Sequence, residues 1–561
     1  MEVTTAPMSI RNRIHRGGKR KLLLLMALTL VVGLSVAACG GEEEQPAAAP
    51  PAPVEPPPPP PPPPPPAPGE PPAPPPPPPP PGDPPPPPPP PPPEQDDAMM
   101  EDDAMMEDDA MMEDDAMMEE GCQVEGVGED GIIRAFQTQD LSEVIGTIAV
   151  HGQRGAQIAL EVLADRGGIL GCELQIDFID EPFDGNDPAP CLRNYREAIQ
   201  SGNYDFYIGP TSSACMFALP DLTKAAGQFV FSGIAADHQP YQENYTKQGP
   251  YIMHPAVSTF LEGRSMAQWA IDNGFSRAAV MVPNYAYGQD VGSSFVKRFE
   301  AAGLEVVSQQ FPEFNEENLT PFINAMVAEE PDLIVMAMFG NFIVPFWQQW
   351  KDCCADLGIA TVTGLAFSST FEVSGLSSAD FADNTYAYNR GDWHLRCATP
   401  TGLELCQRWA EKYGTEDERD LPIPGAFAFV NYGDVLAAAA VIEATGTLDP
   451  DAWVALIESG DFCYDGPYQQ NQTCVNPVNH MANNCAEVGL ITEDPSLHYP
   501  VSYDPATFDV YCMSDVLPPE EVRVLTENPA ATDAAFQTYL DNVAANATTD
   551  AAWVTELPGP R

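Results

Sequence analysis

Positive charge is scarce in this sequence, which has 25 Lys and Arg residues against 82 Asp and Glu residues and a net charge of −57. A nucleic-acid-binding surface needs cationic groups that displace counterions from phosphates, so we expect no nucleic-acid partner. The sequence also lacks a Gly-x-Ser-x-Gly elbow, a P-loop, a His-Glu-x-x-His motif, and a Gly-x-Gly-x-x-Gly motif after an expected strand. We therefore expect no enzymatic activity and no cofactor.

The amino-terminal segment has the order of a secretory signal, because cationic residues at 11–21 precede an apolar run at 22–34. This run is short for a membrane span. It ends in the sequence VAAC at residues 36–39, which resembles the lipobox of bacterial lipoproteins. The resemblance implies removal of residues 1–38, lipidation of Cys39, and a membrane-anchored protein in the periplasm or on the cell surface. The alternative is an uncleaved anchor with an incidental cysteine.

Residues 39–120 have the composition of a disordered linker. Residues 56–93 are nearly pure proline, which predicts a stiff polyproline II spacer on the order of 100 Å long. Four acidic repeats of the type EDDAMM follow and contain no Lys or Arg. Like charges keep such a segment open. Their methionines leave Cu(I) capture as an alternative role.

From about residue 143, short apolar segments alternate with longer segments of helical periodicity. A first series of strands is expected at 146–150, 173–180, 204–210 and 228–235, and a second at 277–283, 304–311 and 332–340. Alternating strands and helices predict βαβ units and parallel sheets, which is an α/β fold. Two series separated near residues 253–259 predict two lobes, and a small-molecule ligand is expected in the cleft between them.

Five segments in this order resemble the substrate-binding proteins of branched-chain amino acid ABC transporters. They are GAQIALEVLADRGGILGCELQIDFID, YIGPTSSA, PNYAYGQDVGSSFVKRFEAAGLEVV, FNEENLTPFINAMVAEEPDLIVM and FVNYGDVLAAAAVIEATG. The resemblance implies the type I periplasmic binding protein fold, with two Rossmann-like lobes, a hinged cleft, and ABC permease subunits as partners. It assigns 143–257, completed by about 388–460, to lobe 1, and 258–387, completed by about 461–512, to lobe 2. Residues 513–561 form a carboxy-terminal extension.

The same resemblance implies a set of ligand-binding residues. Ser212 and Ser213 lie between an expected strand and helix, where hydroxyl and backbone N–H groups suit a carboxylate. Capping of the helix is the alternative role of these serines. The loop containing Ala235 and Ala236 corresponds to the family's second carboxylate-binding loop. The second lobe is expected to contribute Tyr287 or its neighbour Tyr285, together with Phe339, Phe367 and Ser368; packing in the core is their alternative role.

Two departures from the family pattern bear on the ligand. The first loop appears as AVHGQRGAQ and is shorter than the family's loop, which predicts a wider end of the cleft. The amino-acid binders have a carboxylate near the position of Ala366 that pairs with the ligand's ammonium group, whereas this sequence has no acid there until Glu372. A buried ammonium needs a compensating charge, so this absence argues against an α-amino acid as the ligand and favours an amide, a related carboxylate or a larger organic solute.

Twelve cysteines remain beside Cys39, an even number that predicts disulfides in an exported protein. The resemblance implies a bridge between Cys191 and Cys215. Closeness in sequence predicts two further disulfides, which join Cys397 to Cys406 and Cys463 to Cys474. Pairing of Cys485 with Cys512 and of Cys122 with Cys172 is a further hypothesis, and the adjacent Cys353 and Cys354 stay open. Because no histidine lies beside a cysteine pair with ligand spacing, we expect no metal site.

The sequence is consistent with two candidate functions. The first is capture of a small organic solute for an ABC importer. The alternative is a surface-tethered receptor that senses a ligand without transport, which the long proline-rich segment favours.

Overall fold

The computed structural model describes residues 121–139, 141, 146–181, 187–235, 250–256, 258–313, 316–337, 343–364, 384–389, 397, 399–413, 424–468, 471–492, 502–503, 509–516 and 532–546. The signal segment, Cys39 and the linker up to residue 120 lie outside the described residues.

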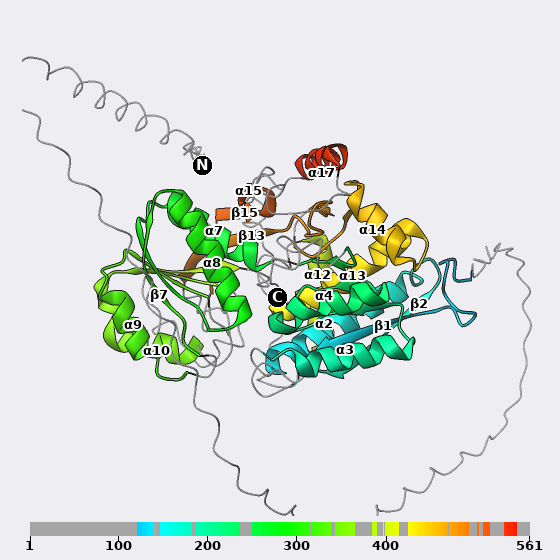
Figure 1. Ribbon diagram of the computed structural model, residues 1–561, viewed down its shortest axis with the longest axis horizontal. Coiled ribbons are helices and arrows are strands. Elements are labelled where there is room, and N and C mark those ends of the chain that lie inside the picture. The colour runs from blue at the N-terminus through cyan, green and yellow to red at the C-terminus, as the bar shows by residue number, and fades with distance from the viewer. Residues whose placement is uncertain are drawn as a thin grey trace, which may run out of the picture. The chain divides into compact units, whose positions relative to one another are not determined.

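A five-stranded parallel sheet forms the core of the first half of the fold (Figure 1). Its strand order is β2-β1-β3-β4-β5, and the strands are β1 (Ile132–Gln139), β2 (Glu173–Asp180), β3 (Phe206–Ile208), β4 (Val230–Phe231) and β5 (Ile252–Met253). The helices that connect the first four strands are α2 (Gly146–Asp165), α3 (Ala189–Ser201) and α4 (Ser213–Ala226). From β1 the chain first moves to β2 on one side, and from β2 it moves back across the sheet to β3 and β4. Because each crossover between parallel strands is right-handed, α2 lies on one face of the sheet and α3 and α4 lie on the other.

An eight-stranded mixed sheet forms the core of the second half. Its parallel part is β6 (Arg277–Met281), β7 (Glu305–Gln310), β8 (Leu333–Met336), β9 (Ala360–Thr363) and β10 (Thr385–Asn389). Antiparallel strands extend it, namely β13 (Cys485–Thr492), β14 (Ser502–Tyr503) and β15 (Asp509–Cys512). Its helices include α7 (Thr259–Asp272), α8 (Ala286–Ala301), α9 (Thr320–Val327), α10 (Ile343–Cys353) and α15 (Met513–Val516). Strand order reverses between β6 and β8, as it does between β1 and β3 in the first sheet.

The chain returns to the first half after β10. There it forms α12 (Pro400–Tyr413), α13 (Ala426–Thr445) and α14 (Pro450–Glu458), and α13 packs along α2. An added Cβ at Gly155 would lie 2.1 Å from the Ala428 carbonyl oxygen, so only glycine permits this approach. α13 has the length and apolar character of a membrane span, with a mean hydropathy of 1.4, but 89% of that window is buried inside the protein, as in a core helix.

A short hairpin and a late helix complete the described fold. The hairpin consists of β11 (Cys463–Tyr464) and β12 (Thr473–Cys474), and the helix is α17 (Asp533–Ala545). Phe536 and Tyr539 of α17 are buried, and Asn542 donates a side-chain hydrogen bond to the Gly460 carbonyl. Part of the carboxy-terminal extension therefore packs on the core.

Two segments that pass between the halves lie side by side. His254 follows β5 and donates its N–H to the His480 carbonyl at 3.0 Å, and Ala482 donates back to the His254 carbonyl at 2.9 Å. The segment around His480 leads from β12 into β13. Paired crossing segments of this kind can bend together as a hinge.

Three expectations for the start of the fold are wrong. Residues 146–150 open helix α2 rather than forming a strand, because the apolar positions of this stretch continue the helical spacing of the sequence that follows. The first strand is β1, which lies before the predicted boundary at residue 143; it ends in the polar sequence QTQ, which hides it from a search for apolar runs. The first loop therefore lies before Gly146, and AVHGQRGAQ is helix rather than a shortened loop.

The cysteines pair as predicted: the structure joins Cys122–Cys172, Cys191–Cys215, Cys397–Cys406, Cys463–Cys474 and Cys485–Cys512. It also joins the adjacent Cys353 and Cys354, which the sequence left open.

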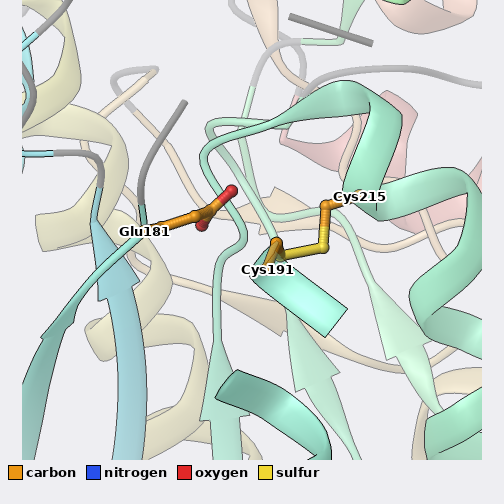
Figure 2. A group of neighbouring side chains, drawn as sticks. All are labelled: Glu181, Cys191 and Cys215. Carbon is orange, nitrogen blue, oxygen red and sulfur yellow. A yellow bond between two sulfur atoms is a disulfide. The ribbon is translucent and has the colours of Figure 1, made fainter. Parts of the chain in front are cut away.

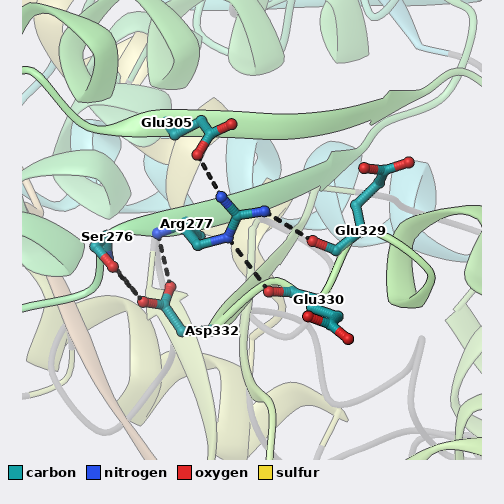
Figure 3. Close-up of polar contacts among 6 residues, drawn as sticks. All are labelled: Ser276, Arg277, Glu305, Glu329, Glu330 and Asp332. Atoms are coloured by element: carbon teal, nitrogen blue, oxygen red, sulfur yellow. Dashed lines mark hydrogen bonds and ion pairs between the residues drawn. The ribbon is translucent and has the colours of Figure 1, made fainter.

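The amino ends of the strands in the second sheet are tied by a polar network. Figure 3 shows Ser276 and Arg277 beside the carboxylate of Asp332, just before β8. This carboxylate accepts the backbone N–H groups of both residues, each at 2.9 Å. The Ser276 hydroxyl donates to the same carboxylate at 2.8 Å. The Arg277 guanidinium contacts Glu305 and the carbonyls of Glu329 and Glu330. This network fixes the register of β6, β7 and β8 at the amino ends of these strands.

Candidate functional site

A buried carboxylate organises the loop between β3 and α4. Glu181 directly follows β2 and is 1% exposed. It accepts backbone N–H bonds from Thr211 and Ser212, each 3.0 Å long, and a bond of 2.6 Å from the Thr138 hydroxyl. Thr138 lies at the end of β1, so Glu181 joins the carboxyl ends of the two strands between which the strand order reverses. Ligands of open α/β sheets bind at such a point.

A second buried carboxylate holds the loop after β4. Asp434 lies in the middle of α13, is fully buried, and accepts the N–H of Gly233 at 3.2 Å. An added Cβ at Gly233 would lie 2.5 Å from Asp434 Oδ1, so the approach requires glycine. The N–H of Ala235, in the same loop after β4, donates to the carbonyl of Pro210 in the loop after β3 at 3.2 Å, so this bond joins the two loops.

Tyr195 of α3 lies near both carboxylates. Its hydroxyl donates to the Ile208 carbonyl at 2.9 Å and lies 3.0 Å from the Thr138 hydroxyl. Burial, followed by the negative charge of Glu181, raises the pKa of Tyr195 well above its usual value, and the charge of Asp434 acts in the same direction. The two carboxylates therefore act on one region of the first half.

One tyrosine of the second half reaches this region. Tyr285 caps the start of α8 after β6, and its hydroxyl accepts the N–H of Ser213 at 2.8 Å. Tyr285 is 2% exposed and Ser213 is 3% exposed. Burial raises the pKa of Tyr285 to about 12, although hydrogen bonds with Ser212 and Ser213 act in the opposite direction. The hydroxyl is therefore neutral at physiological pH.

The hydroxyl of Tyr287 has a different partner from the hydroxyl of Tyr285. Its hydroxyl donates to Glu262 Oε1 of α7 at 2.8 Å, within the second half. Glu262 is fully buried, and an added Cβ at Gly364, after β9, would lie 2.2 Å from its carboxylate oxygen. A buried acid thus lies beside the carboxyl end of β9.

A disulfide packs against Glu181. Figure 2 shows the Cys191–Cys215 bridge between α3 and α4 beside the Glu181 carboxylate, and ligand atoms of all three residues lie within 4.8 Å of one another. Both sulfur atoms belong to the disulfide and offer no thiolate for a metal. The bridge instead ties the two helices that flank the carboxylate.

The structure brings some predicted site residues together and leaves others undescribed. Ser212 and Ser213 lie at the start of α4, where the Ser212 hydroxyl accepts the N–H of Cys215 at 3.3 Å and so serves as a helix cap. Tyr285 lies against Ser213, whereas Tyr287 contacts Glu262. Ala236, Phe339, Phe367 and Ser368 lie outside the described residues.

Neither Glu181 nor Asp434 was among the residues predicted from the sequence. Glu181 was recognisable as the first residue after an expected strand, at the edge where a ligand is expected. Asp434 is the only charged residue between Ala426 and Ile442, and a lone charge in an apolar helix needs a specific partner.

Comparisons with known proteins agree with this geometry. The profile of the periplasmic binding protein family matches residues 138–494, and the chain belongs to this family. A search of curated protein sequences found no match. The predicted type I periplasmic binding protein fold is thus confirmed, and the family is one of extracytoplasmic binding proteins.

Solved structures share this fold at low sequence identity. One is a solute-binding protein of an ABC transporter from Rhodopseudomonas palustris in complex with 4-hydroxybenzoate, with 16% identity, a TM-score of 0.57, and coverage of 68% of this chain and 97% of that one. A substrate-binding protein from Sphaerobacter thermophilus has 16% identity, a TM-score of 0.58, and coverage of 68% and 98%. A leucine-binding protein from Thermotoga maritima has 16% identity, a TM-score of 0.54, and coverage of 68% and 99%.

Proposed function

We propose that this protein is a lipid-anchored solute-binding protein that captures a small organic solute for an ABC importer. The observation that carries the proposal is the contact between Ser213 and Tyr285. These residues follow β3 and β6, so each half contributes the carboxyl end of a strand beside its point of reversal. Solved structures of this fold hold 4-hydroxybenzoate in one case, and another is a leucine-binding protein, which supports an aromatic or amino-acid-sized ligand.

The proposed solute-binding residues come from both halves. The first half contributes Ser212, Ser213, Ala235 and Ala236, and the second contributes Tyr285, Tyr287, Phe339, Phe367 and Ser368. Solute docks on the first half, and rotation about the paired segments at His254 and His480 then brings the second half over it. The solute shifts the equilibrium only through its greater affinity for the closed form. ABC permease subunits would recognise that form.

Calorimetry and closure measurements test this proposal. Tyr285→Phe removes the acceptor of the Ser213 N–H and should weaken solute binding by about 3- to 10-fold, the equivalent of one hydrogen bond. The same variant should shift the ligand-free protein toward the open form in small-angle X-ray scattering. Tyr287→Phe is the matched control for closure, because its hydroxyl bonds within one half. Equal scattering curves for the two variants would remove Tyr285 from the closing contact.

The lipid anchor has a separate test. A Cys39→Ser variant should leave the membrane fraction and still bind solute, because the cysteine carries the anchor and the folded region carries the site. Sedimentation of that variant with membranes would contradict lipidation at Cys39.

Sensing without transport is the second candidate, and the long proline-rich segment favours it because an importer needs no such reach. Deletion of the gene should lower uptake of the bound solute if the protein serves transport. Unchanged uptake together with a lost response to the solute would assign the protein to sensing.

A further inference from the structure

Six backbone donors of the two loops expected to bind a carboxylate are already used within the chain. In the loop after β3, the N–H groups of Thr211 and Ser212 bind Glu181, that of Ser213 binds Tyr285, and that of Cys215 binds Ser212 Oγ. In the loop after β4, the N–H of Gly233 binds Asp434 and that of Ala235 binds the Pro210 carbonyl. A carboxylate of a solute could take these donors only by displacing groups of the protein.

The charges in this region also disfavour a further anion. Glu181 is 1% exposed and Asp434 is fully buried. The hydroxyl of Tyr195 lies between the ends of β1 and β3. The negative charges of Glu181 and Asp434 both raise the pKa of this hydroxyl, so both contribute to the electrostatic potential at the same edge of the sheet. A third carboxylate placed beside two buried carboxylates is repelled and tends to bind a proton instead.

The second half of the fold also has a buried carboxylate at the carboxyl end of a strand. Glu262 is fully buried beside Gly364, which directly follows β9, and it is held by the Tyr287 hydroxyl. The sequence has no acid near Ala366, where the amino-acid binders carry the partner of the ligand's ammonium group. Glu262 of α7 places a carboxylate beside Gly364, which precedes Ala366 by two positions in the sequence.

We propose that Glu181 and Asp434 determine specificity by excluding carboxylate solutes from the first half and selecting solutes that present an amine or an amide. The inference rests on the proposed solute-binding function and narrows its ligand class. Amine and amide N–H groups are donors, and they complement an edge whose own donors are occupied and whose charges are negative.

Matched solutes test the functional group directly. Two series are titrated into the wild-type protein by calorimetry: 4-hydroxybenzoate, 4-hydroxybenzamide and 4-hydroxybenzylamine, then L-leucine, L-leucinamide and 3-methylbutylamine. Within the series that binds, the amide or the amine should bind at least about tenfold more tightly than the carboxylate or amino-acid member, because one uncompensated carboxylate contact costs about this factor. Native mass spectrometry of the purified protein identifies the functional group of any retained solute.

Variants of similar shape but without the charge test whether Glu181 and Asp434 cause the preference for amides and amines over carboxylates. Glu181→Gln and Asp434→Asn keep an acceptor for each loop and remove one charge, so each should narrow the ratio of amide to carboxylate affinity by about threefold or more, and the double variant by about tenfold. Asp205→Asn is the control. Asp205 accepts the N–H of Arg134 at 2.8 Å before β3, at the opposite edge of the same sheet, so this change should leave the ratio unaltered.

The outcomes separate the two proposals. Carboxylates that bind the wild type as tightly as their amides, or ratios unchanged in the folded Gln and Asn variants, overturn the specificity assigned to Glu181 and Asp434 while leaving solute binding in place. Absence of binding by every probe, together with no retained solute, overturns the proposed solute-binding function and this inference with it.

Discussion

Glu181 and Asp332 accept the same set of hydrogen bonds in two different surroundings. Each carboxylate takes two backbone N–H bonds and one hydroxyl bond, and each ties neighbouring parallel strands. Glu181 is buried at the carboxyl edge of the first sheet, whereas Asp332 lies at the amino edge of the second sheet beside the exposed Ser276. The difference shows that surroundings, rather than the number of bonds, decide what a carboxylate contributes.

The energetic reason is access to water. When an exposed carboxylate is removed, water can replace it as acceptor of the N–H groups, and little stability is lost. When a buried one is removed, its donors remain without a partner, and each costs about 1–3 kcal/mol. The carboxyl edge of the first half therefore depends on Glu181 far more than the amino edge of the second half depends on Asp332.

The largest expected effect is that of Glu181→Ala. The variant leaves two buried N–H groups and the Thr138 hydroxyl without their acceptor, and we expect a loss of about 4 kcal/mol in the free energy of unfolding. Urea denaturation followed by circular dichroism measures this loss.

Asp332→Ala is the matched control for that prediction. This variant also removes two backbone N–H bonds and one hydroxyl bond, but at the half-exposed amino ends of the strands in the second sheet. It should lower the free energy of unfolding by about 1 kcal/mol or less. Equal losses for the two variants would show that burial does not separate the two carboxylates.

Removal of the Cys191–Cys215 bridge should have the next largest effect. The pair Cys191→Ser and Cys215→Ser should lower the free energy of unfolding by about 3 kcal/mol, because the unfolded chain gains freedom. It should also weaken solute binding, since the bridge packs against Glu181.

The Cys397–Cys406 bridge supplies the comparison. Its removal should cost stability of similar size without changing solute affinity, because it lies outside the group that contains Glu181. Calorimetric affinity that falls equally in both double variants would argue against a special role for the bridge beside Glu181.

The smallest effect concerns Tyr285 at alkaline pH. Because burial raises the pKa of Tyr285 from 10.0 to about 12, its neutral form is favoured in the folded protein, and that contribution to stability is complete below pH 10 and lost between pH 10 and 12. Tyr285→Phe lacks this loss, so the slope of stability against pH in that range should be shallower by about 1.4 kcal/mol per pH unit. Denaturation curves at pH 9, 10 and 11 measure the slope. Parallel profiles for the two proteins would contradict the raised pKa.

Much of the fold could be predicted from local sequence patterns. The strands expected at 173–180 and 277–283 follow from periodicity within short windows, because the pattern of apolar residues is set by each element's own geometry. β1 could not be found in this way, since its polar end is buried against Glu181 and α13 rather than exposed.

The candidate site was predicted less completely. Ser212 and Ser213 were predicted because they lie between an expected strand and helix, and Tyr285 was named as the neighbour of Tyr287, which the family resemblance implied. Which tyrosine reaches Ser213 depends on the path of the chain between β6 and α8, and no local pattern distinguishes Tyr285 from Tyr287.

Patterns along the chain were enough to predict the α/β class from periodicity, the family from the order of five motifs, and the pairs Cys397–Cys406 and Cys463–Cys474 from their closeness in sequence. Glu181 and Asp434 are 253 positions apart in the sequence, and their roles in holding the two loops at one edge of a sheet could be seen only in the folded chain. The strength of a carboxylate's contacts depends on which groups lie around it and on how little water reaches it, and both are set by packing between distant segments.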